Sequence, residues 1–192
     1  IAAMAAWLGE VVAPLAAAPV TLIGHSMGAL VGLDLASRQP ATVASLCLLG
    51  AAAAMPVHPD LLAAAVRHDP QAVDLMTDWA FGRRGHIGGN LMPGGWMMGT
   101  AKGLLLRGDP AVLASDLAAC DAYADGPRAA AAVGCPTLVV IGAEDRMTPP
   151  VAGAALAERL TGARAVTIED AGHMMMVEAP EATLKALTGF LG

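Results

Sequence analysis

The sequence predicts an α/β protein, in which a mostly parallel sheet is flanked by helices and carries an inserted group of helices. Short runs of aliphatic and β-branched residues alternate with longer segments whose apolar residues recur every three or four positions. A less regular stretch, from about residue 55 to residue 133, interrupts this alternation. A chain of 192 residues is long enough for one such core with a small insertion.

Before the interruption, helices and strands alternate. The pattern predicts a helix over residues 1–17, a strand over 20–24, a helix that ends near Arg38, and a buried strand over 43–49. Pro14, Pro19 and Pro40 lie where these helices are expected to end, as proline cannot continue a helix.

The interruption reads as an inserted helical cap. Two short helices separated near Pro70 and a third after Pro110 are predicted within it. Between them, residues 82–99 form a glycine-rich loop containing Trp96, which fits a mobile, apolar lid. This loop has no Gly-Lys-Ser/Thr and no preceding strand, which argues against a phosphate-binding loop.

After the insertion the alternation resumes. We expect a strand over residues 136–142, a helix capped by Thr148 with Pro149 as its first residue, a strand over 165–168, and a closing helix that opens at 178–181. The chain therefore divides into a first core part over 1–54, the cap over 55–133, and a second core part over 134–192.

Charge and hydropathy exclude several classes of function. Eleven basic against seventeen acidic residues give a net charge of −6, and only Arg83 and Arg84 are adjacent, so no basic face for nucleic acid is expected. No uninterrupted apolar run is long enough to span a membrane, and the beginning of the chain does not resemble a secretory signal. We expect neither a nucleic-acid partner nor a membrane role.

Cysteine and histidine are placed without a metal-binding pattern. Cys47, Cys120 and Cys135 are odd in number and far apart, so they read as free thiols in a reducing cytoplasm. The histidines of the cap lack partners at metal-ligand spacing. No metal and no cofactor are predicted.

Gly24-His25-Ser26-Met27-Gly28 joins the first strand to the second helix. It fits the pattern G-x-S-x-G, in which a serine occupies a strained strand-to-helix turn and its hydroxyl is exposed above the sheet. Side chains two residues before and after the serine would collide there, which explains both glycines. The amide of Met27 lies at the helix N-terminus, where it can donate to an oxyanion. The alternative is an ordinary glycine-serine turn.

With this motif the chain resembles the α/β-hydrolase family. The resemblance implies a nucleophilic serine, an acid after a later strand and a histidine near the C-terminus, in that order. Ser26, Asp145 and His173 each follow a predicted strand in this order, and the carboxyl ends of parallel strands meet at one edge of a sheet. They are the expected catalytic residues, with Met27 N–H as an oxyanion donor.

Other residues compete for these roles. Glu144 is the nearest rival for the acid, although the resemblance favours Asp145, and Asp170 reads as a helper or a solvated carboxylate. His25 adjoins Ser26, yet neighbouring side chains of an extended backbone point to opposite sides. We expect His25 to pack beneath the turn rather than to act as the base.

Flexible apolar side chains surround the predicted site. Met147 follows the acid and Met174 follows the histidine, which favours an apolar acyl or alcohol pocket, although ordinary core filling is the alternative and is preferred for Met175. The candidate substrate-binding residues are His25, Trp96, Met147 and Met174.

The chain departs from the family at its beginning. Only 23 residues precede Gly24, whereas family members have several strands there, and one of their loops supplies a second oxyanion donor. We therefore expect an N-terminally truncated fold with an unpaired sheet edge, through which the chain could self-associate.

The function expected from these residues is hydrolysis of carboxylic esters of small to medium apolar substrates through an acyl-enzyme. Related reactions of the same triad stay open, namely amide and carbon–carbon hydrolysis, acyl transfer and perhydrolysis. A second hypothesis is a catalytically impaired fragment that serves as a binding or assembly module.

Overall fold

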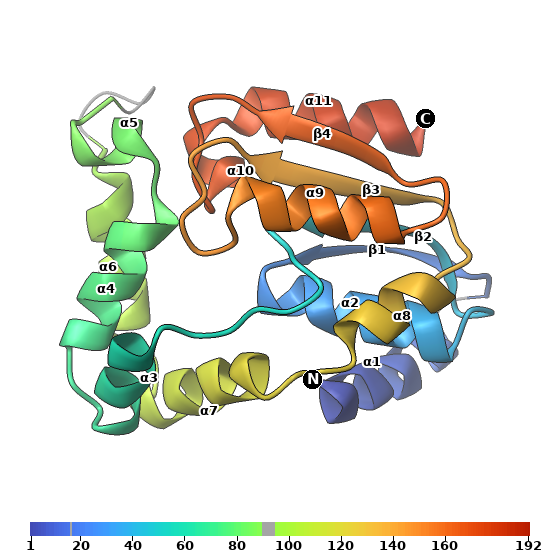
Figure 1. The fold of residues 1–192 in the computed structure, drawn as a ribbon, viewed down its shortest axis with the longest axis horizontal. Helices are drawn as coiled ribbons and strands as arrows, with labels where there is room; N and C mark the ends of the chain where they lie inside the picture. Colours follow the sequence, from blue (N-terminus) through green and yellow to red (C-terminus); the bar gives the residue numbers. More distant parts are fainter. Residues whose placement is uncertain (16, 90–94) are drawn as a thin grey trace.

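Four parallel strands form one sheet in a computed structural model of the chain, which describes residues 1–15, 17–89 and 95–192. In spatial order they are β1 (Val20–His25), β2 (Val43–Leu49), β3 (Thr137–Gly142) and β4 (Arg164–Ile168). Each lies within one residue of its predicted bounds. Because the strands are parallel, their C-terminal ends meet along one edge of the sheet (Figure 1).

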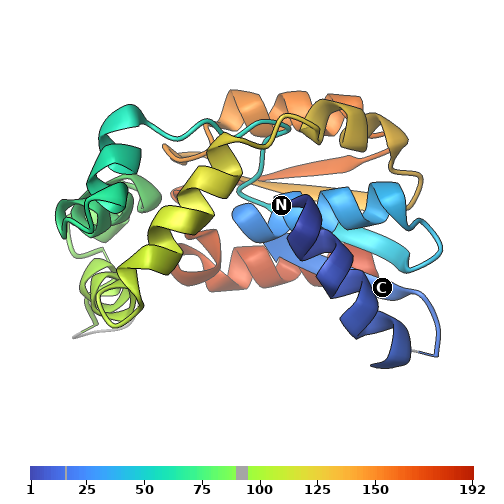
Figure 2. The ribbon, with the colours of Figure 1, turned by 90° about the horizontal axis from the view of Figure 1, so that it is seen from below.

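Helices cover both faces of the central strands. On one face, alternate residues of β2 and β3 pack against α2 (Met27–Arg38), α8 (Gly126–Ala132) and α9 (Pro150–Arg159). On the other face, Cys47, Leu49, Leu138 and Val140 form a second cluster with α11 (Pro180–Leu191). Figure 2 shows α9 and α11 on opposite sides of the sheet. Burial on both faces explains why β2 and β3 are almost continuously apolar.

The β1 edge is less covered than the centre. Among the described strands β1 pairs with β2 alone, and Ile23 is 54% exposed. The first helix, α1 (Ala2–Leu15), packs against α2 and buries only its small residues Ala5 and Gly9, while Trp7 is 63% exposed. The helix was predicted correctly, but most of its apolar face is not buried in this chain. Self-association at this edge stays a prediction.

The segment between β2 and β3 consists of helices beside the C-terminal ends of the strands (Figure 1). They are α3 (Pro59–Val66), α4 (Gln71–Ala80), α5 (Arg83–His86), α6 (Met97–Leu105) and α7 (Pro110–Asp121), followed by α8. Leu61, Ala65, Ala72 and Leu117 form a small apolar core between α3, α4 and α7. The sequence predicted α3, α4 and α7 but not α5, α6 and α8.

Two features of this segment differ from the expected arrangement. Residues 82–99, expected to be a glycine-rich lid, contain α5 and the first turn of α6, and their central part, 90–94, lies outside the described residues. The predicted boundary at residue 133 places α8 in the insertion, yet α8 packs against α2 and α9 in the helical layer of the sheet. Ala129 and Ala130 are fully buried there.

A buried carboxylate fastens the end of the insertion to α2. Asp34 in α2 is fully buried and accepts hydrogen bonds from the Tyr123 hydroxyl (2.8 Å) and from Arg38 Nε (2.6 Å). Because Asp34 has both a charged and a neutral donor, its burial is compensated. The chain after α7 is thereby held against the core.

The segment after β4 contains a short helix, α10 (Met175–Glu178), before α11 begins at Pro180. Met175 is fully buried in the second cluster, so its preferred interpretation as core filling is confirmed. In the described part of the chain, no helix has both the length and the apolar character needed to cross a bilayer.

Candidate active site

Ser26 occupies a strained turn between β1 and α2. Its φ and ψ are 53° and −122°, outside the regions that ordinary residues prefer, and its N–H donates to Leu49 O at 2.9 Å. A Cβ at Gly24 would overlap the carbonyl oxygen of Gly28 and lie 2.7 Å from Ala29 Cα, so only glycine fits where strand and helix cross. The backbone geometry expected for a nucleophile elbow is present.

The second glycine of the motif has a different environment. A Cβ added to Gly28 would meet no atom within 4 Å, so the predicted collision does not occur at this position. The prediction was wrong for Gly28 because the crowding comes from Gly24, which faces the α2 backbone, whereas Gly28 faces open space in this chain.

The helix α2 begins directly after Ser26, so its first amides lie beside the seryl residue. Met27 is the first residue of α2, so no helical carbonyl precedes it to accept its N–H. An amide at this position, assisted by the helix dipole, can donate to a negatively charged oxygen.

Asp145 and His173 form a buried pair. Asp145 follows β3 and His173 follows β4, and Asp145 Oδ2 lies 2.8 Å from His173 Nδ1. The two residues are only 3% and 4% exposed. The structure thus brings together the acid and the base that the sequence singled out.

The Asp145 carboxylate is held by three further donors. Its Oδ1 accepts the backbone N–H of Met147 and of Thr148, each at 2.8 Å, and its Oδ2 accepts the Thr148 hydroxyl at 2.6 Å. The Thr148 hydroxyl was expected to cap the next helix. Instead α9 begins at Pro150 with Pro149 as a cap without a side-chain bond, because the Thr148 side chain is buried against the carboxylate.

Gly50, directly after β2, limits the space around this pair. Its φ is +55°, and a Cβ there would lie 2.9 Å from His173 Nδ1 and 3.4 Å from Asp145 Oδ2. A side chain would therefore be strained and would push the imidazole away from the acid. Sequence reasoning missed Gly50, and the only available signal was a glycine at a strand end.

His25 packs against His173 and was expected to be a packed residue rather than the base. Its Nε2 lies 2.9 Å from His173 O, and the two rings are tilted with centroids 4.6 Å apart. Burial, and then repulsion from His173, lower the pKa of His25 to about 4, despite its bond to the His173 backbone and the attraction of Asp145. His25 is therefore neutral at pH 7 and able to donate to the His173 carbonyl.

The rival acids lie elsewhere. Glu144 Oε2 accepts the backbone N–H of Arg83 at 2.5 Å, so this carboxylate is engaged away from His173. Asp170 is exposed and has a φ of 54° in the turn after β4. Neither makes a side-chain hydrogen bond to His173 among the described residues.

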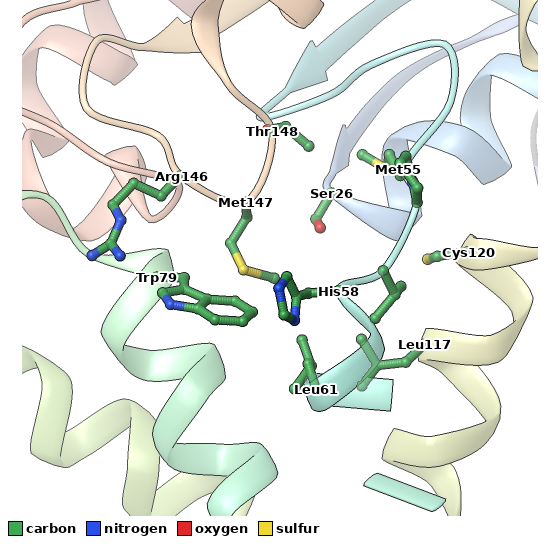
Figure 3. Close-up of a pocket in the computed structure, with 12 residues that line it drawn as sticks. Ser26, Met55, His58, Leu61, Trp79, Leu117, Cys120, Arg146, Met147 and Thr148 are labelled. Carbon is green, nitrogen blue, oxygen red and sulfur yellow. The ribbon is translucent and has the colours of Figure 1, made fainter. Parts of the chain in front are cut away.

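An open cavity of about 350 Å³ lies in front of Ser26. Figure 3 shows the Ser26 hydroxyl at this cavity, between the insertion and the loop after β3. Apolar groups dominate its lining, among them Met55, Leu61, Trp79, Leu117 and Met147. Among the described residues, no hydrogen bond joins Ser26 Oγ to His173, so the seryl group and the Asp145–His173 pair are separate units in this structure.

The candidate substrate-binding residues separate into two groups. Met147 lines the cavity, whereas His25, Met174 and Trp96 are not among its lining residues. Met174 donates its backbone N–H to Ala80 O, and Trp96 is 65% exposed and covers Gly99 at the start of α6. Trp79 and His58 line the cavity, and their rings lie edge to face with centroids 5.3 Å apart. Neither of them was predicted from the sequence as a substrate-binding residue.

Two other side chains limit the chemistry that the cavity can support. His58 Nδ1 accepts the N–H of Asp60 at 3.3 Å, which leaves the proton of the neutral ring on Nε2. Cys120 also lines the cavity, but burial raises the pKa of its thiol to about 11, so it is not a nucleophile at neutral pH. Within residues 1–15, 17–89 and 95–192, no group of three His, Cys, Asp or Glu side chains could hold a metal ion.

Comparison with known proteins agrees with this architecture. A model of the alpha/beta hydrolase family matches residues 1–186. The pimeloyl-[acyl-carrier protein] methyl ester esterase of Neisseria meningitidis serogroup B is 32% identical over 181 residues, covering 86% of this chain and 66% of that protein. A putative carbamate hydrolase of Klebsiella pneumoniae is 28% identical over 192 residues, covering 88% of this chain and 66% of that protein.

Among solved structures, a thermophilic esterase from Thermogutta terrifontis with malate bound superposes with a TM-score of 0.84 at 25% identity, covering 99% of this chain and 71% of that chain. The chain spans 66% of the length of these two curated relatives. The fold class expected from the sequence is confirmed.

The two glycines of the elbow give a matched test. Gly24→Ala should lower the free energy of unfolding by about 3 kcal/mol because its Cβ overlaps the α2 backbone. Gly28→Ala should stay within about 1 kcal/mol of the parent, since a helical alanine is favoured over glycine and no atom is close. Urea unfolding of both variants measures the difference. Equal losses in the free energy of unfolding would contradict the conclusion that only Gly24 is crowded by the α2 backbone.

His25 should make the protein acid-sensitive. The pKa of His25 is about 4 in the folded chain and 6.5 in the unfolded chain, so the unfolded state binds more protons at pH values between the two. The free energy of unfolding therefore falls as the pH drops through this window. From pH 7 to pH 5 the parent should lose about 1 to 2 kcal/mol through this residue. His25→Gln, which keeps a side-chain N–H, should lose correspondingly less in urea unfolding at the two pH values.

Proposed function

The chain belongs to the α/β-hydrolase family, and from this premise we propose that it is a serine hydrolase that cleaves carboxylic esters of small to medium apolar substrates. The observation that carries the proposal is the position of Ser26, in a strained elbow that opens into an apolar cavity, at the same sheet edge as the buried Asp145–His173 pair. Relatives named as esterases support the reaction class.

In the proposed mechanism His173 Nε2 accepts the proton of Ser26 Oγ as the oxygen attacks the ester carbonyl. Asp145, already bonded to Nδ1, keeps the ring in the tautomer that leaves Nε2 free and stabilises the imidazolium that forms. The Met27 N–H would donate to the oxygen that becomes negative. His173 then protonates the leaving alcohol, and water activated by the same ring releases the acid from Ser26.

Chemistry requires Ser26 and His173 to become hydrogen-bonded. Among the described residues they are not, and a nucleophile–base bond that is long in the free protein commonly shortens when substrate binds. Asp145 is fixed by its backbone and Thr148 donors, so we assign the adjustment to the Ser26 side chain, whose hydroxyl rotates about a single bond.

The cavity favours an apolar acyl or alcohol group. A volume of about 350 Å³ lies at the lower end of ordinary ligand pockets, consistent with short to medium chains. The relative named as a methyl ester esterase makes methyl esters the first alcohol portion to test. The relative named as a putative carbamate hydrolase makes carbamates the second candidate class, since the same serine attack applies to their carbonyl.

The nucleophile is tested directly by a fluorophosphonate probe. We expect the parent chain to gain the mass of one probe and to hydrolyse p-nitrophenyl esters, and Ser26→Ala to lose labelling and at least about 10³-fold in kcat/KM. Ser37→Ala, which removes a hydroxyl bonded to Asp34 O within α2, is the control and should label like the parent. Turnover that survived in Ser26→Ala would refute the mechanism.

A folded parent chain that neither labels nor turns over ester would instead favour the second hypothesis, a binding or assembly module.

The pocket wall is tested through Trp79. Its indole lies in the cavity beside His58, so Trp79→Ala should lengthen the pocket and raise the ratio of kcat/KM for hexanoate over acetate esters about 10-fold. Trp7→Ala, at an exposed site on α1, should leave the ratio unchanged. A series of p-nitrophenyl esters of increasing acyl length measures this ratio in both variants. An equal rise of the ratio in both would contradict the role of Trp79 as a wall of the acyl pocket.

A further inference from the structure

Two buried carboxylates, those of Asp34 and Glu178, take no part in the proposed chemistry. Asp34 accepts hydrogen bonds from Tyr123 and Arg38. Glu178, at the end of α10, instead lies under the loop that carries His173 and is only 3% exposed. It is the one of the two that can influence the site.

The two oxygens of Glu178 accept backbone N–H groups from two separate segments of the chain. Oε1 accepts the N–H of Gly172 at 2.9 Å, and Oε2 accepts the N–H of Gly82 at 2.7 Å. Gly172 immediately precedes His173, and Gly82 joins α4 to α5. One side chain therefore links the histidine loop to the insertion.

The two backbones that Glu178 links are in direct contact. A Cβ on Gly172 would lie 2.5 Å from Gly82 N and 2.9 Å from Ala80 O, so this approach is possible only for glycine. On the other side of His173, the N–H of Met174 donates to Ala80 O at 3.1 Å. His173 is thus flanked, one residue before and one after, by bonds that anchor its backbone.

The acid loop is tied to the same segment through a second carboxylate. Glu144 Oε2 accepts the N–H of Arg83, next to Gly82, and Glu144 N donates to Ala171 O at 2.8 Å. Burial raises the pKa of Glu178, the backbone N–H groups of Gly82, Gly172 and Met174 lower it, and the nearby Glu144 raises it. A carboxylate that is buried beside a second acid requires these amide donors to stay charged.

We propose that Glu178 is a positioning residue of the active site, whose carboxylate fixes the backbone of residues 172–174 to Gly82 and so holds the His173 imidazole on Asp145. The assignment rests on the proposed function for its catalytic consequence, but not for its structural one. Glu178 does not touch substrate, and it acts through the loop. Glu181, three residues later in the chain, is exposed and lies in the first turn of α11.

Glu178→Gln tests the hydrogen bonds of the Glu178 carboxylate without changing the size of the side chain. Glutamine has the same shape but one donor group in place of an acceptor, so one of the two backbone N–H groups loses its partner. We expect kcat for a p-nitrophenyl ester to fall about 10- to 100-fold with KM within about 2-fold, because a small misplacement of the base affects the chemical step and not the pocket. Glu181→Gln is the matched control and should keep parental values.

A readout without turnover distinguishes this proposal from the proposed function. In proton NMR at pH 7, the Nδ1 proton of His173 shared with the buried Asp145 should give a low-field signal in the parent and in Glu181→Gln, and a broadened or missing one in Glu178→Gln. If the parent failed to label or turn over, the proposed function would fail while this comparison still decided the role of Glu178.

The parent protein provides a measurement that needs no variant. Amide exchange should show the Gly82 and Gly172 N–H groups protected to a similar degree, since one carboxylate accepts both. Rapid exchange at either amide would overturn the proposal even if Glu178→Gln did not fold. A folded Glu178→Gln with a parental kcat, or with a parental His173 signal, would overturn it as well.

Discussion

The site depends on keeping a charged carboxylate and an imidazole together out of water. An unpaired ionised carboxylate is too costly to bury, so Asp145 needs a full set of donors before it can orient His173. It has two amides of its own loop, the Thr148 hydroxyl and the imidazole. The glycine at position 50 leaves the space for this arrangement, and the parallel sheet brings its parts to one edge. The donors of Asp145, Gly50 and the parallel sheet are each needed to keep Asp145 and His173 paired.

The sequence predicted what depends on local pattern. The four strands follow from runs of aliphatic and β-branched residues, and Ser26, Asp145 and His173 could be singled out because each lies within a few residues after such a run. Thr148 was assigned to a helix cap because its nearest visible partner along the chain is the helix that follows. In the structure a carboxylate three residues earlier takes its hydroxyl, a choice that only burial decides.

What the sequence could not predict depends on contacts between distant segments. Gly50 meets His173 and Glu178 meets Gly82 across roughly a hundred residues, and no periodicity records such pairs. The helix α5 was missed because four residues are too few for a periodic pattern, and α6 because two glycines interrupt it. The helix α8 was missed because alanine dominates it and gives little apolar contrast. The candidate Trp96 was chosen for its position in a loop, whereas Trp79 reaches the cavity from a regular helix.

The placement of the insertion between β2 and β3 bears on how the chain folds. Leu46 pairs with Thr137, so roughly ninety residues separate partners that become adjacent in the sheet, and closing so long a stretch is entropically unfavourable. The β1–β2 pair closes a much shorter stretch. Because distant pairings form slowly, the two halves of the site should assemble in the order in which the strands join, with the Ser26 turn formed early and the Asp145–His173 pair late. The helices of the insertion bring β2 and β3 nearer as they form, so local structure in the segment that lines the cavity governs how soon the site is complete.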